Sequence, residues 1–198
     1  MEQHAIFTRR EAFTKGGMLG AASFFLAADG AAAQPPQGSA KTLVAYFSRT
    51  GNTRLIARQV RRAVVADLFE IEPADPYPED YGETVARSKK EQDAGFEPPL
   101  KATVPNIASY QTVFLGFPVW GTSAPAVIKS FLSRHDVAGK TLVPLITHGG
   151  YGLGQSLRVI AAAAPRARLA RGLSMQAEQE REVLAKVTGW LGKLRIDR

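Results

Sequence analysis

The chain contains no cysteine and only three histidines, His4, His135 and His148, among its 198 residues. The absence of cysteine excludes disulfide bonds, thiolate metal sites, iron–sulfur clusters and cysteine nucleophiles. The histidines are too few and too far apart in the sequence to form a histidine-rich metal site. Chemistry that depends on thiols or on clustered imidazoles is therefore excluded, and we predict no metal ligand.

Carboxylates are also scarce relative to cations, since 18 Asp and Glu stand against 25 Lys and Arg and give a formal net charge of +7. The hydrophobic fraction of 45% excludes a disordered chain, and the length suits one domain with a core. A basic protein points first to nucleic acid or to an anionic surface.

The position of the charge argues against nucleic acid. Residues 34–140 carry 13 cations and 11 carboxylates (13 − 11 = +2), whereas residues 141–198 carry 9 and 4 (9 − 4 = +5). The excess lies in the C-terminal third, and no basic strip interleaved with exposed aromatic residues is present. We expect no nucleic acid as a partner. An acidic redox partner protein or an anionic membrane surface fits the charge instead.

The N-terminus has the pattern of an export signal. Arg9 and Arg10 precede the uncharged segment 16–28, and Ala31 and Ala33 give the small-x-small pattern of a signal-peptidase site. The uncharged segment is shorter than the about 20 apolar residues that span a membrane.

This pattern resembles a twin-arginine signal peptide. We predict a signal peptide at 1–33 that is cleaved near Ala33, a linker at 34–40, and a mature protein that is periplasmic or otherwise exported. The alternative is that the N-terminal segment is a helix of the domain itself.

Short apolar segments alternate with amphipathic segments along the rest of the chain. Uninterrupted apolar runs of strand length are typical of strands buried on both faces of a parallel sheet. The alternation predicts an α/β domain with right-handed crossovers. Strands are predicted at 41–47, 69–72, 113–117, 141–147 and 169–173. Helices are predicted at 53–65, 79–92, 125–132, 155–164 and 183–194.

The loop Ser48-Arg49-Thr50-Gly51-Asn52-Thr53 lies between the first predicted strand and its helix. Ligands of open parallel sheets bind beyond the carboxyl ends of the strands. Three hydroxyl groups, an amide and a glycine beside the free N–H groups of a helix N-terminus indicate an anion site. Simple N-capping is the alternative, although one cap does not require so many donors. The loop is neither a Walker A string nor G-x-G-x-x-G.

Two further loops follow the second and third buried strands. The loop 116–125 carries Trp120, which is either a core tryptophan or the aromatic wall of a ligand site. The loop 147–154 contains four glycines, which allow its backbone to approach a flat ligand. Tyr151 is expected either to stack on that ligand or to lie over the rim. His148 is expected either to bind the ligand or to cap the following helix.

The string S-x-T-G-N-T directly after a strand, with the two other loops in this order, resembles the flavodoxin-like superfamily from residue 41 to the C-terminus. The resemblance implies a flavodoxin-like FMN-binding domain at 41–198. It implies a doubly wound five-stranded parallel sheet of order 2-1-3-4-5 with helices on both faces. The first loop would hold the FMN phosphate and the other two the isoalloxazine ring. The cofactor-binding residues implied are Ser48, Arg49, Thr50, Gly51, Asn52, Thr53, Pro118, Val119, Trp120, Gly121, Thr122, His148, Gly149, Gly150, Tyr151 and Gly154.

Three functions are compatible with this resemblance. The leading hypothesis is an exported FMN-binding electron-transfer protein with no catalytic residue of its own. In it, the backbone at Gly121 would bond to the flavin N5–H, because glycine tolerates positive φ. The first alternative is an FMN-dependent oxidoreductase that reduces quinones or similar small acceptors. The second is a non-redox module that binds another phosphorylated ligand. Flavodoxins that carry electrons are typically acidic, so the net charge of +7 is a departure from the family pattern.

Overall fold

A parallel sheet forms the centre of the computed structural model, which describes residues 41–176 and 180–194. The predicted signal peptide at 1–33 and the linker at 34–40 lie outside the described residues. The strand order is β2-β1-β3-β4-β5, with β6 also paired to β4, so the predicted order is confirmed. The strands are β1 (Thr42–Tyr46), β2 (Asp67–Glu70), β3 (Thr112–Pro118), β4 (Thr141–His148), β5 (Arg168–Leu169) and β6 (Leu173–Gln176).

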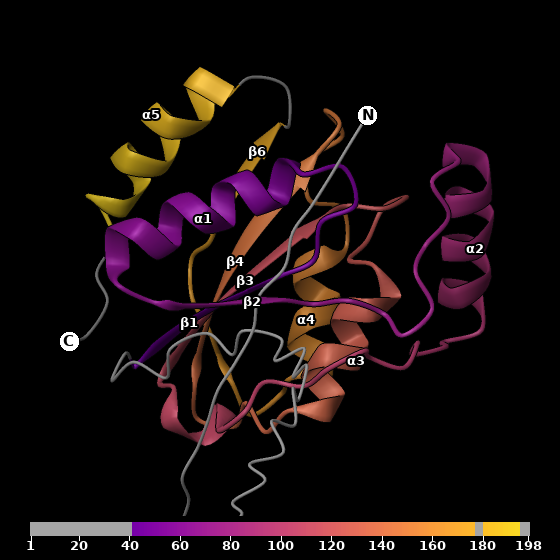
Figure 1. The fold of residues 1–198 in the computed structure, drawn as a ribbon, viewed down its shortest axis with the longest axis horizontal. Coiled ribbons are helices and arrows are strands. Elements are labelled where there is room, and N and C mark those ends of the chain that lie inside the picture. Colours follow the sequence, from indigo (N-terminus) through magenta and orange to yellow (C-terminus); the bar gives the residue numbers. More distant parts are fainter. Residues whose placement is uncertain (1–40, 177–179, 195–198) are drawn as a thin grey trace, which may run out of the picture. The chain divides into compact units, whose positions relative to one another are not determined.

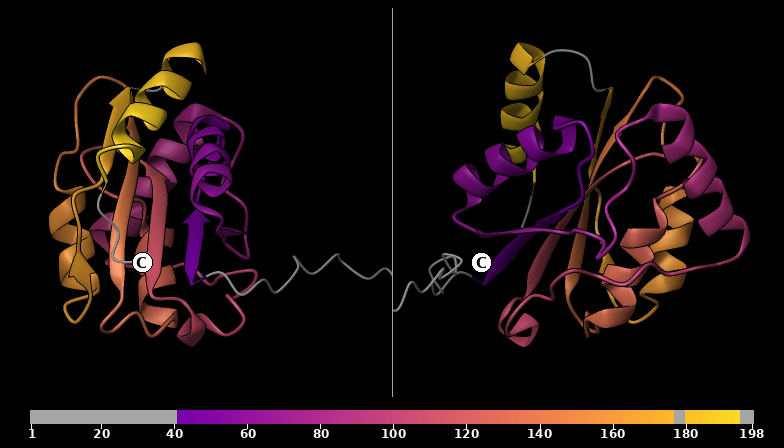
Figure 2. Two further views of the ribbon diagram at one scale, coloured as in Figure 1. Left: turned by 90° about the vertical axis from the view of Figure 1, so that its left-hand side faces the viewer. Right: turned by 45° about the vertical axis from the view of Figure 1, so that its right-hand side comes forward.

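Helices cover both faces of this sheet (Figure 1). The helices α1 and α5 pack together on one face, and α3 and α4 pack together on the other (Figure 2). No helix among the described residues is long and apolar enough to cross a membrane. The helices are α1 (Asn52–Val64), α2 (Tyr81–Asp93), α3 (Ala126–Arg134), α4 (Ser156–Ala163) and α5 (Glu180–Leu191), with a 3₁₀ turn at Ile107–Ser109.

Two hydrophobic clusters, one on each face, explain why the central strands are apolar throughout. Phe114 of β3 packs with Ile56 of α1 and Val187 of α5. Leu115 and Phe117 of the same strand point the other way and belong to the cluster that includes Phe131 of α3. Side chains on both faces of β3 are therefore buried, as expected for a parallel sheet with helices on each face.

The edge beyond β4 differs from the prediction, since two short strands, β5 and β6, replace the single strand expected at 169–173. Ala170 donates a hydrogen bond to the carbonyl of Leu142 at 2.9 Å, and Pro144 is the next residue whose backbone faces this side. Proline has no N–H to donate, so the ladder is interrupted there. Gly172 passes so close that a Cβ would overlap the Pro144 carbonyl oxygen. Pairing resumes where Leu145 meets Leu173.

The segment between β2 and β3 forms an excursion built around α2. The prediction began this helix two residues early, because Asp80 is its N-cap and accepts a hydrogen bond from the Glu83 N–H at 2.8 Å. A buried network fixes the segment: Arg87 bonds to the Glu91 carboxylate at 2.9 Å, and the Tyr77 hydroxyl donates to the same carboxylate at 2.7 Å. This network supports one wall of the candidate site.

Candidate functional site

The three loops predicted from the sequence meet at the carboxyl ends of β1, β3 and β4, near the top of the sheet in Figure 1. A cavity of about 210 Å³ lies between them. It is lined by Ser48, Arg49, Thr50, Asn52, Thr53, Pro118, Val119, Trp120, Thr147, His148 and Gly149. Of the predicted residues, Gly51, Gly121, Thr122, Gly150, Tyr151 and Gly154 do not line this cavity.

The first loop leaves the N-terminus of α1 without a side-chain cap. Gly51 is the N-cap residue, with φ of 93°, a conformation that suits glycine. The Ser48 hydroxyl accepts a hydrogen bond from the Gly51 N–H at 3.2 Å and so folds the loop rather than capping the helix. The first N–H groups of a helix have no intrahelical acceptor. They are therefore available for an anion, and the alternative of simple capping is wrong.

A buried pair of hydroxyl groups holds the first loop against the third. Thr53 Oγ1 and Thr147 Oγ1 lie 2.9 Å apart. The helix comes this close to the sheet because residue 116 is glycine, where a Cβ would lie 2.9 Å from the Tyr46 Cβ and 3.1 Å from the Thr53 Cγ2. Thr147 lines the cavity but was not among the predicted site residues. Its polar side chain at the end of an apolar strand is the signal that could have identified it.

Trp120 forms an aromatic wall, and it is half-buried rather than a core residue. Its indole meets the ring of Tyr77 edge to face at 4.7 Å between centroids, and that of Phe47 at 5.2 Å. Its backbone exchanges two hydrogen bonds with Ser123, at 2.9 and 3.1 Å. Gln92 of α2 donates to the Trp120 carbonyl at 3.4 Å. The ring is therefore held from behind while it lines the cavity.

Tyr77 fixes this wall to the buried network of α2. Its pKa is raised well above the usual range, first by burial and then by its hydrogen bond to the carboxylate of Glu91. The phenol therefore stays protonated and keeps donating its bond. The guanidinium of Arg87 lies over the same ring, 4.5 Å from its centroid, and adds a cation–π contact.

The third loop places His148 at the cavity and Tyr151 outside it. His148 Nδ1 accepts a hydrogen bond from the Gly150 N–H at 3.2 Å, which leaves Nε2 as the ring nitrogen that carries the proton. The N-cap of α4 is Gln155 and has no side-chain cap bond, so His148 does not cap that helix. Tyr151 is 96% exposed and does not line the cavity, so its ring lies in solvent.

Gly154 joins the second and third loops rather than lining the cavity. Its φ is 52°, and a Cβ there would overlap the Thr122 carbonyl oxygen. That oxygen also accepts a hydrogen bond from the Gln155 N–H at 2.7 Å. Gly121 has φ of 60°, and Gly150 has φ of 111°. The positive φ values of these glycines set the path of the two loops around the cavity.

The cavity suits a flat anionic ligand. Arg49 lines it and no carboxylate does, so its field is positive. Hydroxyl groups and unpaired N–H groups at a helix N-terminus are the donors that a phosphate group requires. An indole and the backbone of a glycine-rich loop offer flat contacts for a ring system. Among the described residues, no group of carboxylates and histidines could hold a metal ion.

Comparison with known proteins agrees with this geometry. The flavodoxin family model matches residues 41–193. An inferred flavoprotein from Bacteroides eggerthii is 34% identical over 79% of this chain and 98% of its own, with a TM-score of 0.68. A second one, from Bacteroides uniformis, is 31% identical over 74% of this chain and 97% of its own, with a TM-score of 0.66.

The fold is also that of a flavoprotein from Lactobacillus acidophilus solved in complex with FMN. That protein is 17% identical over 73% of this chain and 97% of its own, with a TM-score of 0.61. No curated protein matches the chain significantly.

Proposed function

The chain belongs to the flavodoxin family, and from that premise we propose that it is an FMN-binding electron-transfer protein. When bound, FMN supplies the redox chemistry, and the protein holds the group and sets its potentials. The observation that carries the proposal is the uncapped N-terminus of α1 beside the hydroxyl groups of Ser48 and Thr50, with Trp120 across the same cavity.

Each part of the cavity then has a role toward the cofactor. The donors of the first loop, Ser48, Thr50 and Asn52, would bind the phosphate together with the N–H groups of α1. Trp120 would lie against the isoalloxazine ring, and the backbone of Gly149 would approach the ring edge. Arg49 would add positive charge near the phosphate while its Nη1 donates to the Glu79 carbonyl at 3.1 Å.

The test compares FMN with riboflavin, which has the same ring without the phosphate. Purified residues 34–198 should be yellow or should take up added FMN with quenching of flavin fluorescence. Ser48→Ala and Thr50→Ala should each weaken FMN binding by about 10- to 100-fold, because each removes a charge-assisted hydrogen bond of about 1.5–3 kcal/mol. Riboflavin affinity should stay within twofold. Protein that takes up no flavin, or variants that weaken both ligands equally, would contradict the proposal.

Reduction of small acceptors is a second candidate, and the position of Tyr151 favours it. This side chain is 96% exposed and does not line the cavity, so among the described residues Trp120 is the only Phe, Tyr or Trp side chain that does. A bound ring would then keep one face open to a molecule the size of a quinone. Stopped-flow reoxidation of the reduced protein by benzoquinone distinguishes the two functions, because rapid saturable kinetics indicate an acceptor site. A linear dependence on quinone concentration would favour the carrier.

Export is part of the proposal and depends on the sequence of residues 1–33. The paired arginines Arg9 and Arg10 and the small residues Ala31 and Ala33 support a twin-arginine signal cleaved near Ala33. Arg9→Lys with Arg10→Lys should keep the protein in the cytoplasmic fraction, because this route recognises the arginine pair. Unchanged periplasmic recovery of the double variant would refute this route.

A further inference from the structure

The end of the sheet where the strands begin, opposite the candidate site, carries many positive charges. All paired strands are parallel, so the segments that precede them lie at the same end of the sheet. The C-terminal ends of the helices that connect the strands lie at this end too. We call this the amino-end surface: residues 41, 61–67, 108–112, 134–141, 164–169 and 192–194. Its cations are Lys41, Arg61, Arg62, Arg134, Lys140, Arg166, Arg168 and Lys193, and its carboxylates are Asp67 and Asp136.

The two carboxylates compensate little of this charge. Asp67 accepts a hydrogen bond from the Tyr110 hydroxyl at 2.8 Å, and Asp136 lies 3.7 Å from Arg166, with both side chains largely exposed. Exposed ion pairs of this length contribute little. In the described part of the chain, no carboxylate forms a salt bridge or hydrogen bond with the other cations of the surface, although Asp136 also acts on Lys140 through space.

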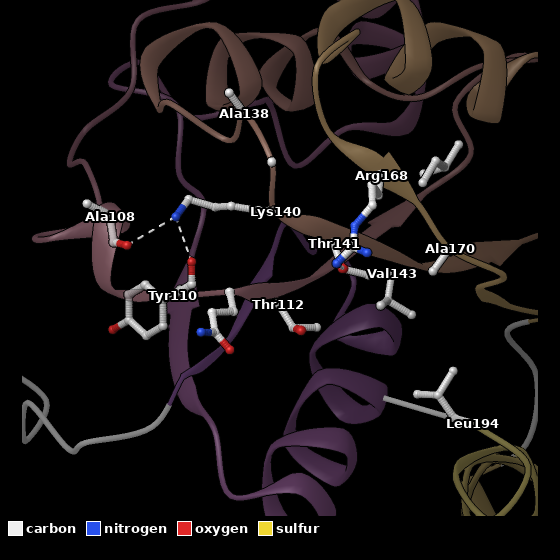
Figure 3. Close-up of a pocket in the computed structure, with 13 residues that line it drawn as sticks. Ala108, Tyr110, Thr112, Ala138, Lys140, Thr141, Val143, Arg168, Ala170 and Leu194 are labelled. Carbon is white, nitrogen blue, oxygen red and sulfur yellow. Dashed lines mark hydrogen bonds between the residues drawn. The ribbon is translucent and has the colours of Figure 1, made fainter. Parts of the chain in front are cut away.

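A cavity of about 620 Å³ opens within the amino-end surface (Figure 3). On one side lies Lys140, whose residue is 8% exposed and whose Nζ donates to the carbonyls of Tyr110 at 2.6 Å and Ala108 at 3.3 Å. Arg168 donates to the Thr141 hydroxyl at 3.0 Å and has further N–H groups free. Among the described residues this ammonium bonds to carbonyls and to no carboxylate, and Asp136 acts on it only through space. A bound anion would therefore stabilise it further. Val143, Leu169, Ala170 and Leu194 form an apolar part of the lining, and the polar residues Gln111, Thr112 and Thr141 lie in it as well.

Val65 is an exposed apolar residue in a conformation that disfavours it. It ends α1 with φ of 49° and ψ of 73°, and it is 81% exposed. Glycine usually occupies this position, and a β-branched residue there is a genuine outlier. The other described non-glycine residue with positive φ is Asn106, a type that tolerates it. Neither packing nor backbone preference explains this valine.

Val65 lies among the exposed cations. It directly follows the last turn of α1, which contains Arg61 and Arg62. The β1–β2 ladder begins where Leu43 pairs with Asp67, two residues after Lys41 and Val65, so both of these residues lie at the end of the sheet where the strands begin. An apolar side chain surrounded by cations is the composition of surfaces that insert shallowly into anionic bilayers.

We propose that the amino-end surface docks the protein on anionic phospholipid, with Val65 entering the interface and a headgroup phosphate at the cavity between Lys140 and Arg168. Charge complementarity favours an anionic partner. The exposed Val65 and the apolar part of the cavity lining favour an amphiphile over a purely polar acidic protein. The FMN cavity lies at the carboxyl ends of the strands, so docking through the amino-end surface leaves the cavity accessible.

The test measures cosedimentation with vesicles by flavin absorbance and protein stain. Residues 34–198 are used, so that the N-terminal segment does not contribute. This part folds on its own, because 35–198 is a compact unit and a crystallised relative corresponds to little more than this domain. Phosphatidylglycerol vesicles should bind the protein, phosphatidylcholine vesicles should not, and raised salt should release it.

Two variants separate this surface from net charge in general. Arg62→Gln with Arg168→Gln should weaken binding to phosphatidylglycerol by roughly 30-fold, since each cation near an anionic bilayer contributes on the order of 1 kcal/mol. The matched control is Lys90→Gln with Arg158→Gln, which removes the same charge from exposed positions on α2 and α4. The control should weaken binding by less than threefold. Equal loss in both variants would overturn the assignment of the surface.

Val65→Gly distinguishes a docking role from a structural one. Glycine accepts the backbone conformation, so the variant should melt at the same temperature as the parent or a few degrees higher, yet bind vesicles about fivefold more weakly. Vesicle binding that is unchanged by this substitution would exclude insertion of Val65. Binding to polyglutamate with the same dependence on Arg62 and Arg168, but none to vesicles, would assign the surface to an acidic protein and overturn the lipid proposal.

Discussion

The hydroxyl groups of Thr53 and Thr147 lie 2.9 Å apart and form a buried hydrogen bond between the start of α1 and the end of β4. One residue belongs to the predicted phosphate loop and the other to the loop that carries His148. The bond spans 94 positions of sequence. It fixes the distance between the two loops that line the candidate FMN cavity.

Thr147→Val tests this bond. The substitution keeps the shape of the side chain but leaves the buried Thr53 hydroxyl without its partner, so the free energy of unfolding should fall by about 1–3 kcal/mol. Replacing both residues by valine should recover most of this loss, because no buried donor is then unpaired. Urea unfolding of the flavin-free protein measures both, and a double variant as unstable as the sum of the single ones would show that the pair is not coupled.

Trp120 is predicted to contribute to flavin affinity through its ring. Trp120→Leu should raise the Kd for FMN by about tenfold, since an aromatic pair contributes about 0.5–1.5 kcal/mol beyond the area it buries. Trp120→Phe should keep most of the affinity. Trp190→Phe is the control, because Trp190 of α5 packs edge to face on Phe114 of β3 and does not line the cavity. It should leave the Kd unchanged, and an equal effect at both tryptophans would indicate general destabilisation.

Gly121→Ala is predicted to change the one-electron potentials of bound FMN. Gly121 has φ of 60°, which costs an alanine about 1 kcal/mol and shifts the orientation of the peptide beside Trp120. If that peptide bonds to flavin N5–H, the separation of the two potentials should change by about 40 mV. Gly152→Ala matches the strain, with φ of 75° in the third loop rather than in the residue after Trp120, and should leave the potentials as they are. Identical potentials in all three proteins would refute the role of Gly121.

The sequence was sufficient to predict the sheet order and the three loops of the site, because both depend on local patterns. Buried parallel strands appear as uninterrupted apolar runs, and their loops carry glycine and hydroxyl residues in short strings. The boundaries of β1, α1, β3, α3 and α4 are within two residues of those predicted. The helix predicted at 183–194 begins and ends three residues earlier, and its residues Val187, Trp190 and Leu191 belong to one hydrophobic cluster.

What the sequence could not provide are relationships between distant residues. The break between β5 and β6 depends on Pro144 lying opposite Gly172, two residues that are adjacent only in the folded sheet. The contact of Thr147 with Thr53 and the support of Trp120 by Tyr77 are likewise tertiary. The sequence alone therefore does not decide whether Trp120 is buried in the core or lines a cavity, because this depends on the rings of Tyr77 and Phe47 that pack against it.

A buried histidine joins the long excursion to the rest of the fold. His135, at the C-terminal end of α3, accepts a hydrogen bond at Nε2 from the Val104 N–H at 2.8 Å. Its Nδ1 is 2.7 Å from the Phe131 carbonyl and therefore carries the proton. The imidazole is thus neutral, and burial lowers its pKa below the ordinary 6.5. A protonated ring could not accept the bond from Val104.

Stability should therefore decline in mild acid. Because the pKa of His135 is lower in the folded protein, the unfolded chain binds more protons below pH 6.5, and the free energy of unfolding falls as the pH drops. The contribution is fully present above pH 6.5 and is lost towards the folded pKa. His135→Gln should reduce stability by about 1–2 kcal/mol at neutral pH and should flatten the decline between about pH 7 and pH 5. Urea unfolding of both proteins across this range provides the difference, in which contributions of other titrating groups cancel. Parallel curves for the two proteins would mean that His135 is not the group that titrates.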